Sequence, residues 1–566
     1  MPTPARPGPS GRRPIRNVAL VGPSGSGKST LVDALLRHTG SSAVGDPNDR
    51  PTGALSLVAI RQAGVTVHLL DTPGHADFVG EVVAGLRAAD GVVFVVSAVA
   101  GLDPVNAQLW QQCSAAGLAR VVVVTHLDSH RADFDETVAL CQRVLDEDVL
   151  ALNLPMHDDG GSVAGLLTLL DARVVDHSTG RRVERTADPE HLALVDALRT
   201  DLIEALVGGS EDETLLDRYL DGKQPEPQQL AEALAAGVAS GQLWPVLATA
   251  PLAGVGLAEL LDLLVDAFPA PAERACPPVS RPDGAPALPL ACDPAGPLVA
   301  EVVRTAADAE GRRLSFVRVF SGTLRPEITV TARGHRVDGP AQRASEVVGP
   351  LAAPQGSSLH PVDSCSAGDL CAVAGLDSAG TGDTLSAVDD PLLLAAWSLP
   401  EPQLPIAVEG ASPLDREQLS AALRRLVCED PVARLEWREA TRQQVLWCTG
   451  PLHAEVLLDR LRSRDGTEVR TPDVEVPLRQ VASGLLEPWC AVSIFVPTAF
   501  ARSVLSDLSG RRARRATRES DPEDDEQSVV RVELPEVELL GYAAALRVVS
   551  HGTGSFSRRA IGDEPR

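Results

Sequence analysis

The stretch NVALVGPSGSGKSTLVDALLRH, at residues 17–38, decides the fold of the first part of this chain. It passes from a short apolar run through a glycine-rich loop into apolar residues at helical spacing, which predicts a strand, a loop and a helix. The loop GPSGSGKS matches the pattern G-x-x-x-x-G-K-[ST]. In such a loop, backbone N–H groups and the helix N-terminus bind phosphate oxygens, the lysine reaches the β- and γ-phosphates, and the serine can ligate Mg²⁺. The predicted nucleotide-binding residues are Gly22, Pro23, Ser24, Gly25, Ser26, Gly27, Lys28, Ser29 and Thr30, and Ser29 is also a predicted metal ligand.

A second motif, DTPGH at residues 71–75, follows the next apolar run. It places Asp71 at the carboxyl end of a strand, near the expected Mg²⁺ and γ-phosphate. In GTPases, the glycine amide of this turn contacts the γ-phosphate and the next side chain can orient the attacking water. The alternative is an ordinary turn with a surface histidine. Together with the phosphate loop, the motif predicts Asp71 as a metal and nucleotide ligand, Gly74 as a nucleotide contact and His75 as the catalytic residue.

The base-recognition motif is altered. Guanine-specific GTPases usually carry Asn-Lys-x-Asp, whereas VVVVTHLD at residues 121–128 ends in Thr125, His126 and Asp128. Asp128 keeps guanine recognition, because its carboxylate accepts hydrogen bonds from two ring-edge donors that adenine lacks. Thr125 offers one hydroxyl in place of an amide, and the His126 ring can cover the base. Thr249 and Ala250 follow a later strand, where a backbone amide would contact the guanine oxygen. We expect retained guanine selectivity and lower affinity.

Composition limits the classes of protein that remain. The chain has 566 residues, 44% of them apolar, and this length indicates several domains. The net charge of −26 argues against general attraction to nucleic acid. We expect no sequence-specific DNA binding, and interpret RRARRATR at residues 511–518, which precedes an acidic run, as a solvated loop. No apolar run could span a membrane and no signal peptide is recognisable, which favours the cytoplasm. Nine cysteines without a C-x-x-C pair predict reduced thiols and no metal site among them.

The order of motifs resembles elongation factor G and its actinobacterial relatives, nearly end to end. The resemblance rests on the phosphate loop and on DTPGHADFVGEV, THLD, ATAPLAGVG, LPMHDDGGSVAGLLTLLDARV, FVRVFSGTLRP, CTGPLHAEVLLDRL, LLEPWCAVSIFVP and LLGYAAALRVVSHGTGSFS. It implies a translational GTPase that uses GTP, GDP and Mg²⁺, has the large ribosomal subunit as partner, and acts as a monomer.

The expected fold is a multidomain α/β protein, because strand-like runs and helical segments alternate from residue 17 to about 147. A P-loop GTPase domain with an insertion precedes a β-barrel and two α+β domains. The expected bounds are 1–16 for a disordered leader, 17–272 for the GTPase domain with an insertion at about 152–243, 273–395 for the barrel or second domain, 396–480 for the third domain and 485–558 for the fifth.

Two departures from the family pattern bear on function. In the family, the strand equivalent to VEVPLRQ leads into a fourth domain that reaches the decoding region, whereas only residues 481–484 separate it here from LLEPW. Because so few residues cannot encode a domain, the fourth domain is absent and translocation is not expected. The first switch is short, with Arg50 and Pro51 before Thr52, the residue predicted to ligate Mg²⁺ in the GTP state. Hydrolysis is therefore expected to be weak or stimulated by a partner.

The sequence favours a ribosome-associated GTPase that docks and releases without translocating. One alternative is a non-catalytic GTP-binding sensor that acts away from the ribosome. Another is an ATPase or kinase built on the same phosphate loop. Asp128 and the domain order disfavour the latter, and no L-S-G-G-Q segment typical of transporter ATPases follows the loop.

Overall fold

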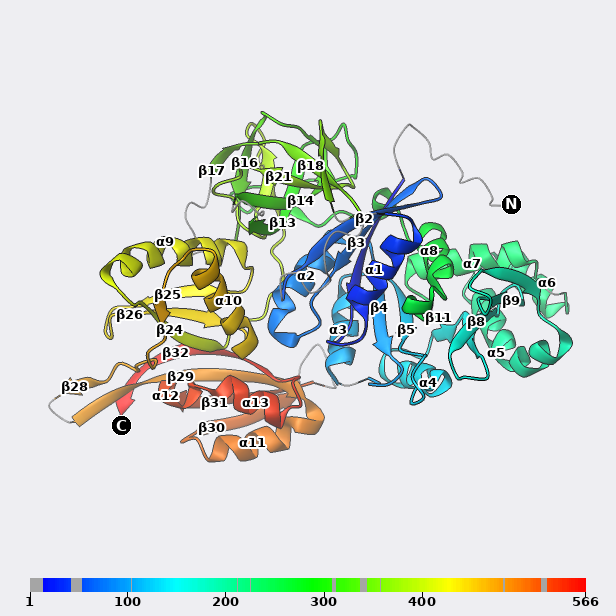
Figure 1. Cartoon of the computed structure of the whole chain (residues 1–566). Coiled ribbons are helices and arrows are strands. Elements are labelled where there is room, and N and C mark those ends of the chain that lie inside the picture. The colour runs from blue at the N-terminus through cyan, green and yellow to red at the C-terminus, as the bar shows by residue number, and fades with distance from the viewer. Residues whose placement is uncertain are drawn as a thin grey trace. The chain divides into compact units, whose positions relative to one another are not determined.

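The computed structural model describes residues 14–41, 53–102, 104–210, 212–223, 225–307, 312–335, 344–356, 358–481, 484–520 and 527–566. The chain forms two compact units (Figure 1). The first comprises the described residues of Met1–Gly74, Glu81–Asp308 and Arg312–Ala396, and the second comprises those of His75–Gly80 and Trp397–Arg566. His75–Gly80 therefore packs with the C-terminal part of the chain, although its sequence lies inside the expected GTPase domain.

A seven-stranded sheet with the order β2-β3-β1-β4-β5-β11-β6 is the centre of the first unit. Its strands are β1 (Ile15–Val21), β2 (Ser56–Gln62), β3 (Val65–Asp71), β4 (Gly91–Ser97), β5 (Ala119–Thr125), β6 (Val149–Ala151) and β11 (Trp244–Ala248). All neighbours pair in parallel except β2 and β3. Every residue of β4 and β5 is buried, as expected for a parallel sheet covered on both faces. The predicted α/β fold is confirmed, although β1 already includes Ile15 and Arg16 of the expected leader.

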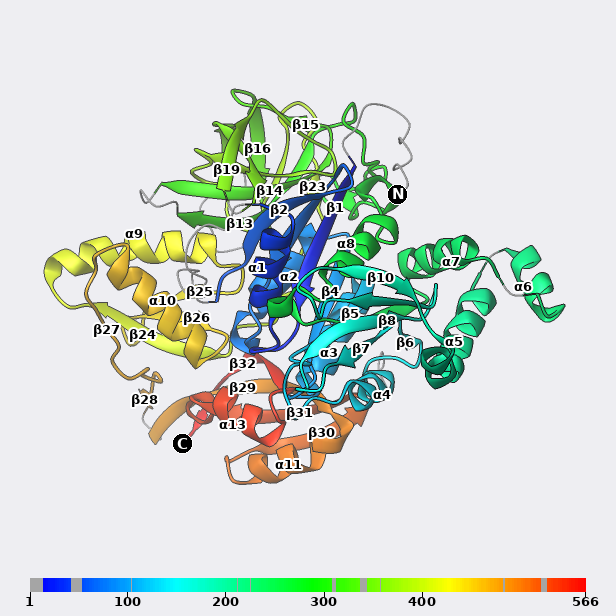
Figure 2. The same cartoon turned by 45° about the vertical axis from the view of Figure 1, so that its right-hand side comes forward.

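Helices accompany this sheet, and a separate substructure is inserted between β6 and β11 (Figure 2). The helices are α1 (Lys28–His38), α2 (Val79–Ala88), α3 (Pro104–Ala115), α4 (Phe134–Val144) and α8 (Leu257–Asp266). The insertion contains a sheet of order β10-β9-β8-β7. Its elements are β7 (Asn153–His157), β8 (Val163–Thr168), β9 (Arg173–Asp176), β10 (Val183–Thr186), α5 (Pro189–Gly208), α6 (Glu213–Leu220) and α7 (Pro227–Ser240).

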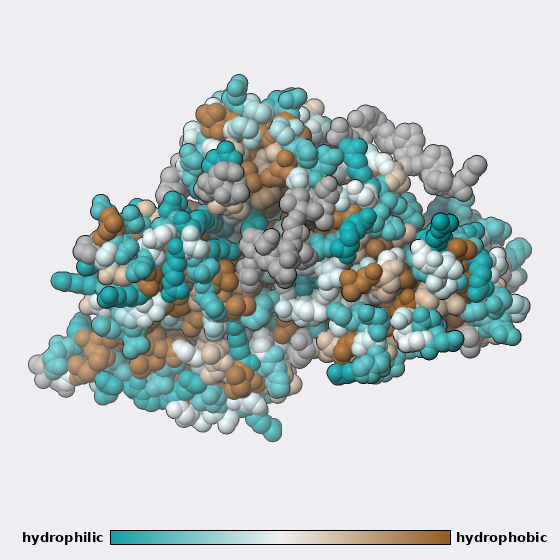
Figure 3. All heavy atoms as spheres, in the orientation of Figure 1, coloured by the Kyte–Doolittle hydropathy of each residue, from teal (hydrophilic) through white to brown (hydrophobic). Residues whose placement is uncertain are grey.

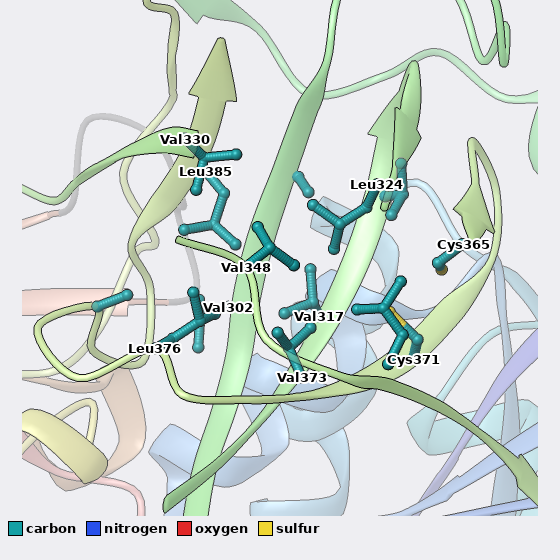
Figure 4. Close-up of a cluster of buried hydrophobic side chains, with 14 of the residues drawn as sticks. Val302, Val317, Leu324, Val330, Val348, Cys365, Cys371, Val373, Leu376 and Leu385 are labelled. Atoms are coloured by element: carbon teal, nitrogen blue, oxygen red, sulfur yellow. The ribbon is translucent and has the colours of Figure 1, made fainter. Parts of the chain in front are cut away.

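The second domain is an antiparallel eight-stranded sheet of order β17-β16-β22-β13-β14-β21-β18-β19. Its strands are β13 (Val299–Ala307), β14 (Arg313–Ser321), β16 (Thr329–Arg333), β17 (Ala344–Val347), β18 (Leu351–Gln355), β19 (Ser358–Val362), β21 (Leu370–Ala374) and β22 (Thr384–Ala387). Short pairs are formed by β15 (Thr323–Leu324) with β20 (Cys365–Ser366), and by β12 (Val279–Ser280) with β23 (Leu393–Leu394). Side chains from many of these strands meet in one apolar core, which includes Val302, Val317 and Val373 (Figure 4).

A buried polar network joins the second domain to the GTPase domain within the first unit. Arg318 Nη2 donates to both carboxylate oxygens of Asp90, each at 3.0 Å. Asn17 Nδ2 donates to Asp90 Oδ2 at 2.7 Å and to the Gly368 carbonyl at 3.0 Å. Because a buried charge that loses its partner is strongly destabilising, this network holds the two domains together as one body.

The second unit contains two α+β domains with separate cores. The third domain has a sheet of order β25-β26-β24-β27, and the last domain a sheet of order β28-β29-β31-β30 with β32 on the other side of β29. The third domain is formed by β24 (Leu404–Gly410), α9 (Pro413–Glu429), β25 (Arg434–Arg438), β26 (Gln443–Cys448), α10 (Pro451–Ser463) and β27 (Val469–Arg470). The last is formed by β28 (Arg479–Val481), β29 (Gly484–Pro497), α11 (Ala501–Ser509), β30 (Arg514–Ser520), β31 (Gln527–Pro535), α12 (Glu536–Leu539), α13 (Tyr542–Val549) and β32 (Ser555–Pro565).

The junction at which the family carries a fourth domain is a hairpin. β28 pairs antiparallel with β29, with Arg479 opposite Leu486 and Val481 opposite Gly484. The two strands that would lead into and out of a domain are thus partners of each other. Among the described residues, no further domain lies between these two strands, which agrees with the predicted absence of the fourth domain.

The arginine-rich segment differs from its prediction. The sequence predicts a loop, but residues from Arg514 onward form β30, an exposed edge strand. Arg514 pairs with Glu564, and Arg515 Nη1 lies 2.7 Å from Glu533 Oε1. The guanidinium groups are largely neutralised inside the domain, so the segment does not form a basic face.

All nine cysteines are free thiols, as predicted. No helix among the described residues is long and apolar enough to cross a membrane. Hydrophobic residues on the face drawn in Figure 3 are dispersed among hydrophilic ones.

Candidate functional site

The phosphate loop lies between β1 and α1, as the motif predicts. Gly27 is the N-cap of α1 with a φ of 90°, and Gly22 has a φ of 150°. A Cβ atom on Gly22 would lie only 2.3 Å from the carbonyl oxygen of Val95 in β4. Glycine is therefore required at both positions, by backbone conformation and by close approach to the neighbouring strand.

Lys28 is buried beneath this loop. Its Nζ donates to the carbonyl oxygens of Gly22 at 2.7 Å and Pro23 at 2.8 Å. Burial lowers the pKa of the Lys28 ammonium to about 8, and the nearby Asp71 carboxylate opposes part of this shift. A Cβ on Gly74 would lie 2.5 Å from Lys28 Nζ, so the DTPGH turn packs directly against the lysine. The loop and the turn predicted to contact the γ-phosphate are thus brought together.

Ser29 and Asp71 form the part of the site that fits Mg²⁺. Ser29 Oγ donates to Asp71 Oδ2 at 2.7 Å, at the carboxyl end of β3. A hydroxyl and a carboxylate, completed by phosphate oxygens and water, are the donor set that Mg²⁺ prefers. Thr30 lies on the exposed side of the first turn of α1. The third predicted ligand, Thr52, lies outside the described residues.

Thr125 ties the base-recognition motif to the phosphate loop. Its hydroxyl is buried, lies 2.7 Å from the Ser26 carbonyl and 3.2 Å from the Val96 carbonyl, and approaches His126 Nδ1 at 3.0 Å. His126 has a φ of 58° and an exposed side chain, and a Cβ on Gly27 would lie 3.4 Å from its Cε1. The Thr125 hydroxyl therefore fixes the base-recognition motif against the phosphate loop, and the His126 ring lies beside that loop.

Asp128 is exposed, one residue beyond the buried Leu127. Among the residues that the structure describes, no hydrogen bond or ion pair occupies its carboxylate. Both oxygens are therefore open to donors of a guanine ring.

The amides of Thr249 and Ala250, which are predicted to contact guanine, form hydrogen bonds within the protein. The N–H and hydroxyl of Thr249 both donate to the Val124 carbonyl, at 2.9 and 3.0 Å. The Ala250 N–H donates to the Val255 carbonyl at 3.1 Å. Both amides thus have hydrogen-bond partners inside the protein. Either amide would have to exchange its present partner to contact a guanine base.

His75 belongs by its contacts to the second unit. It caps the short 3₁₀ helix η2 (Ala76–Phe78), and its Nδ1 accepts a hydrogen bond from the Asp77 N–H at 3.2 Å. The accepting Nδ1 assigns the proton of the neutral ring to Nε2. The side chain is 47% exposed, so its free nitrogen can reach a water molecule.

One feature next to the first switch was not predicted from the sequence. The Leu55 N–H donates to Glu81 Oε2 at 3.0 Å, and its carbonyl accepts from Arg304 of the second domain. Arg304 Nε also lies 3.6 Å from Glu81 Oε2. The chain three residues after Thr52 is therefore fixed by side chains that no local motif marks.

The sequence matches four family descriptions in the observed order. Residues 13–270 match the elongation factor Tu GTP-binding domain, residues 297–388 match elongation factor G domain 2, residues 399–473 match elongation factor G domain III, and residues 484–565 match the elongation factor G C-terminus. Only residues 474–483 separate the last two matches.

Individual proteins agree with this assignment. An elongation factor G-like protein of Mycobacterium tuberculosis (strain H37Rv) is 34% identical over an alignment 697 positions long, which covers 99% of this chain and 96% of the relative. Elongation factor G 2 of Geobacter metallireducens is 32% identical over 82% of this chain and 69% of its own length. A solved structure of a protein from Thermus thermophilus matches with a TM-score of 0.78 and 25% identity, over 98% of this chain and 97% of that one.

Proposed function

Because the chain belongs to the elongation factor G family of guanine-nucleotide-binding proteins, we propose that it is a GTPase that docks on the ribosome in its GTP state and leaves after hydrolysis, without translocating. The family match of residues 13–270 supports nucleotide binding and hydrolysis in general. The observation that supports the nucleotide part most directly is the pair formed by Ser29 and Asp71 beside the buried Lys28.

The roles proposed for the individual residues rest on the sequence motifs and on the contacts inside each unit. The loop N–H groups and Lys28 bind the phosphates, and Asp128 selects guanine. Ser29 and Asp71 would hold Mg²⁺, and the bound ion would neutralise charge on the phosphate oxygens. His75 orients the attacking water through its free ring nitrogen. Such an interaction is made in the transition state and not in the ground state, so it contributes to turnover and not to nucleotide affinity.

The ribosome is proposed as the partner from family membership. The large subunit is the proposed docking surface, because the deletion removes only the domain that would reach the small subunit. The hairpin of β28 and β29 argues against translocation, because the chain has no lever to couple hydrolysis to movement of transfer RNA.

The test is sedimentation of the purified chain with ribosomes in a non-hydrolysable GTP analogue and in GDP. We expect co-sedimentation in the analogue only, competition with authentic elongation factor G, and faster phosphate release when ribosomes are added. Lys28→Ala is the matched control and is expected to lose all three. Efficient translocation by this chain would refute the proposed lack of translocation. Phosphate release unaffected by ribosomes, with no competition at high concentration, would favour the GTP-binding sensor that acts elsewhere.

A further inference from the structure

Asp77 is a buried, hydrogen-bonded side chain in the segment that contains His75. Its carboxylate is 1% exposed and accepts hydrogen bonds from the N–H of Leu452 at 2.8 Å and of His453 at 3.4 Å, at the start of α10. The first N–H groups of a helix have no partner inside the helix, and their end of the helix dipole favours an anion. The carboxylate therefore completes the N-terminus of α10 from a distant part of the chain.

Arg547 of α13 supplies the second half of this anchor. Its Nη1 pairs with Asp77 Oδ1, and its Nη2 donates to the Thr449 carbonyl at 2.9 Å. The Thr449 hydroxyl in turn donates to the Asp77 carbonyl. A Cβ on Gly450 would lie 2.3 Å from both Arg547 Nη1 and Asp77 Oδ1, so only glycine permits this approach. We call the contacts of Asp77 with α10, Thr449 and Arg547 the Asp77 anchor.

The anchor reaches His75 through the backbone N–H of Asp77, and the anchored carboxylate oxygen Asp77 Oδ1 also lies 3.8 Å from His75 Nδ1. The Asp77 N–H that donates to His75 Nδ1 belongs to the residue whose side chain and carbonyl are both fixed. The direction of this N–H therefore sets the orientation of the ring and keeps the proton on Nε2. If the anchor is lost, the ring remains but its direction is no longer defined.

The other end of the same segment packs against Val432, in a turn that a buried pair of side chains holds in place. His453 Nε2 lies 2.9 Å from Asp430 Oδ2, and Asp430 Oδ1 accepts from the N–H groups of Val432 at 2.9 Å and Ala433 at 2.7 Å. A Cβ on Gly80 would lie 2.5 Å from Val432 Cγ2. The segment is thus fixed at Asp77 by a charge and at Gly80 by close packing.

We propose that Arg547, in the last domain, is a positioning residue for His75 and acts through the Asp77 anchor. This inference rests on the proposed role of His75 in orienting water. It makes hydrolysis depend on the last domain being folded and docked on the third domain. Nucleotide binding does not require the anchor, because the phosphate and base contacts lie in the first unit.

The test measures phosphate release at saturating ribosomes and GTP affinity for the full chain and its variants. Arg547→Ala is expected to lower kcat on the order of tenfold and leave the Kd for GTP unchanged, since misdirected catalytic groups cost turnover and not binding. Arg547→Lys restores the charge without the second hydrogen bond and should recover part of kcat. Arg559→Ala removes an exposed arginine of the same domain and is the matched control. In a His75→Ala background, Arg547→Ala should lower kcat by less than about twofold further.

The outcomes separate the inference from the function on which it rests. If His75→Ala lowers kcat but Arg547→Ala does not, the positioning role is refuted and the role of His75 stands. An additive loss in the double variant would show that Arg547 acts by another route. If Arg547→Ala does not fold, Asp77→Asn, which keeps the shape of the side chain and removes the charge, must give the same loss of kcat at unchanged Kd. If His75→Ala keeps full kcat, His75 has no catalytic role, and the inference about Arg547 is refuted as well.

Discussion

Lys28 should make GTP binding take up a proton above neutral pH. In the nucleotide-free protein, burial lowers the pKa of its ammonium to about 8. Phosphates placed beside it favour the charged form and raise this pKa again. The group therefore stays charged in the complex at a pH where it is partly neutral in the free protein. Affinity should be constant at lower pH and fall as the pH rises through about 8.

The size of the effect follows from the lowered pKa. If the bound pKa lies well above the assay range, the dissociation constant of GTP should rise about fourfold between pH 7 and pH 8.5, and binding at pH 8.5 should take up about 0.8 proton. Isothermal titration in buffers of different ionisation enthalpy measures both quantities. Lys28→Arg, whose side chain stays charged, should bind more weakly but with a flat pH profile. A flat profile in the parent protein would refute the reasoning. It would mean that the carbonyls of Gly22 and Pro23 offset the loss of hydration and keep the ammonium fully charged.

Three further predictions concern the base-recognition motif. Asp128→Asn should shift preference from guanine to xanthine nucleotides, because an amide reverses the hydrogen-bond pattern at the ring edge; competition titrations would show it, and unchanged guanine preference would contradict it. His126→Lys should tighten GTP binding by about 1 kcal/mol, because it restores a long stem over the base and a positive charge. An unchanged dissociation constant would mean that the ring already fits its place beside Gly27. Thr125→Val should lower the unfolding free energy by about 1–3 kcal/mol and weaken GTP binding, because it leaves the Ser26 carbonyl without its partner; thermal melts and titrations that match the parent would exclude this role.

The sequence alone predicted the parts of the fold that depend on local pattern. The phosphate loop lies between a strand and a helix because glycine spacing and apolar periodicity specify this locally. Asp71 and Thr125 reach one edge of the sheet because the carboxyl ends of parallel strands share that edge. The clean loss of the fourth domain was also predictable, from the shortness of the junction.

The remainder depends on contacts between residues far apart in the chain. Nothing in the letters around Asp77 marks Arg547 as its partner, because the pair is joined only by the packing of two later domains. The internal hydrogen bonds of the Thr249 and Ala250 amides could not be predicted, because they depend on backbone geometry that composition does not reveal. The hydrogen bond from Arg304 to the Leu55 carbonyl was also not predicted, because it too joins residues far apart in the chain.

The hairpin of β28 and β29 is a position at which a folded domain could be inserted into this chain. Antiparallel partners have Cα atoms about 4.5–5.5 Å apart, so the chain enters and leaves this point at adjacent positions. Any folded module whose own termini are neighbours could be spliced in at the tip, or cut out again, without moving the register of β29 against β31 and β32. The same position is suited to the insertion of a fluorescent reporter or an affinity module in engineered versions of the protein.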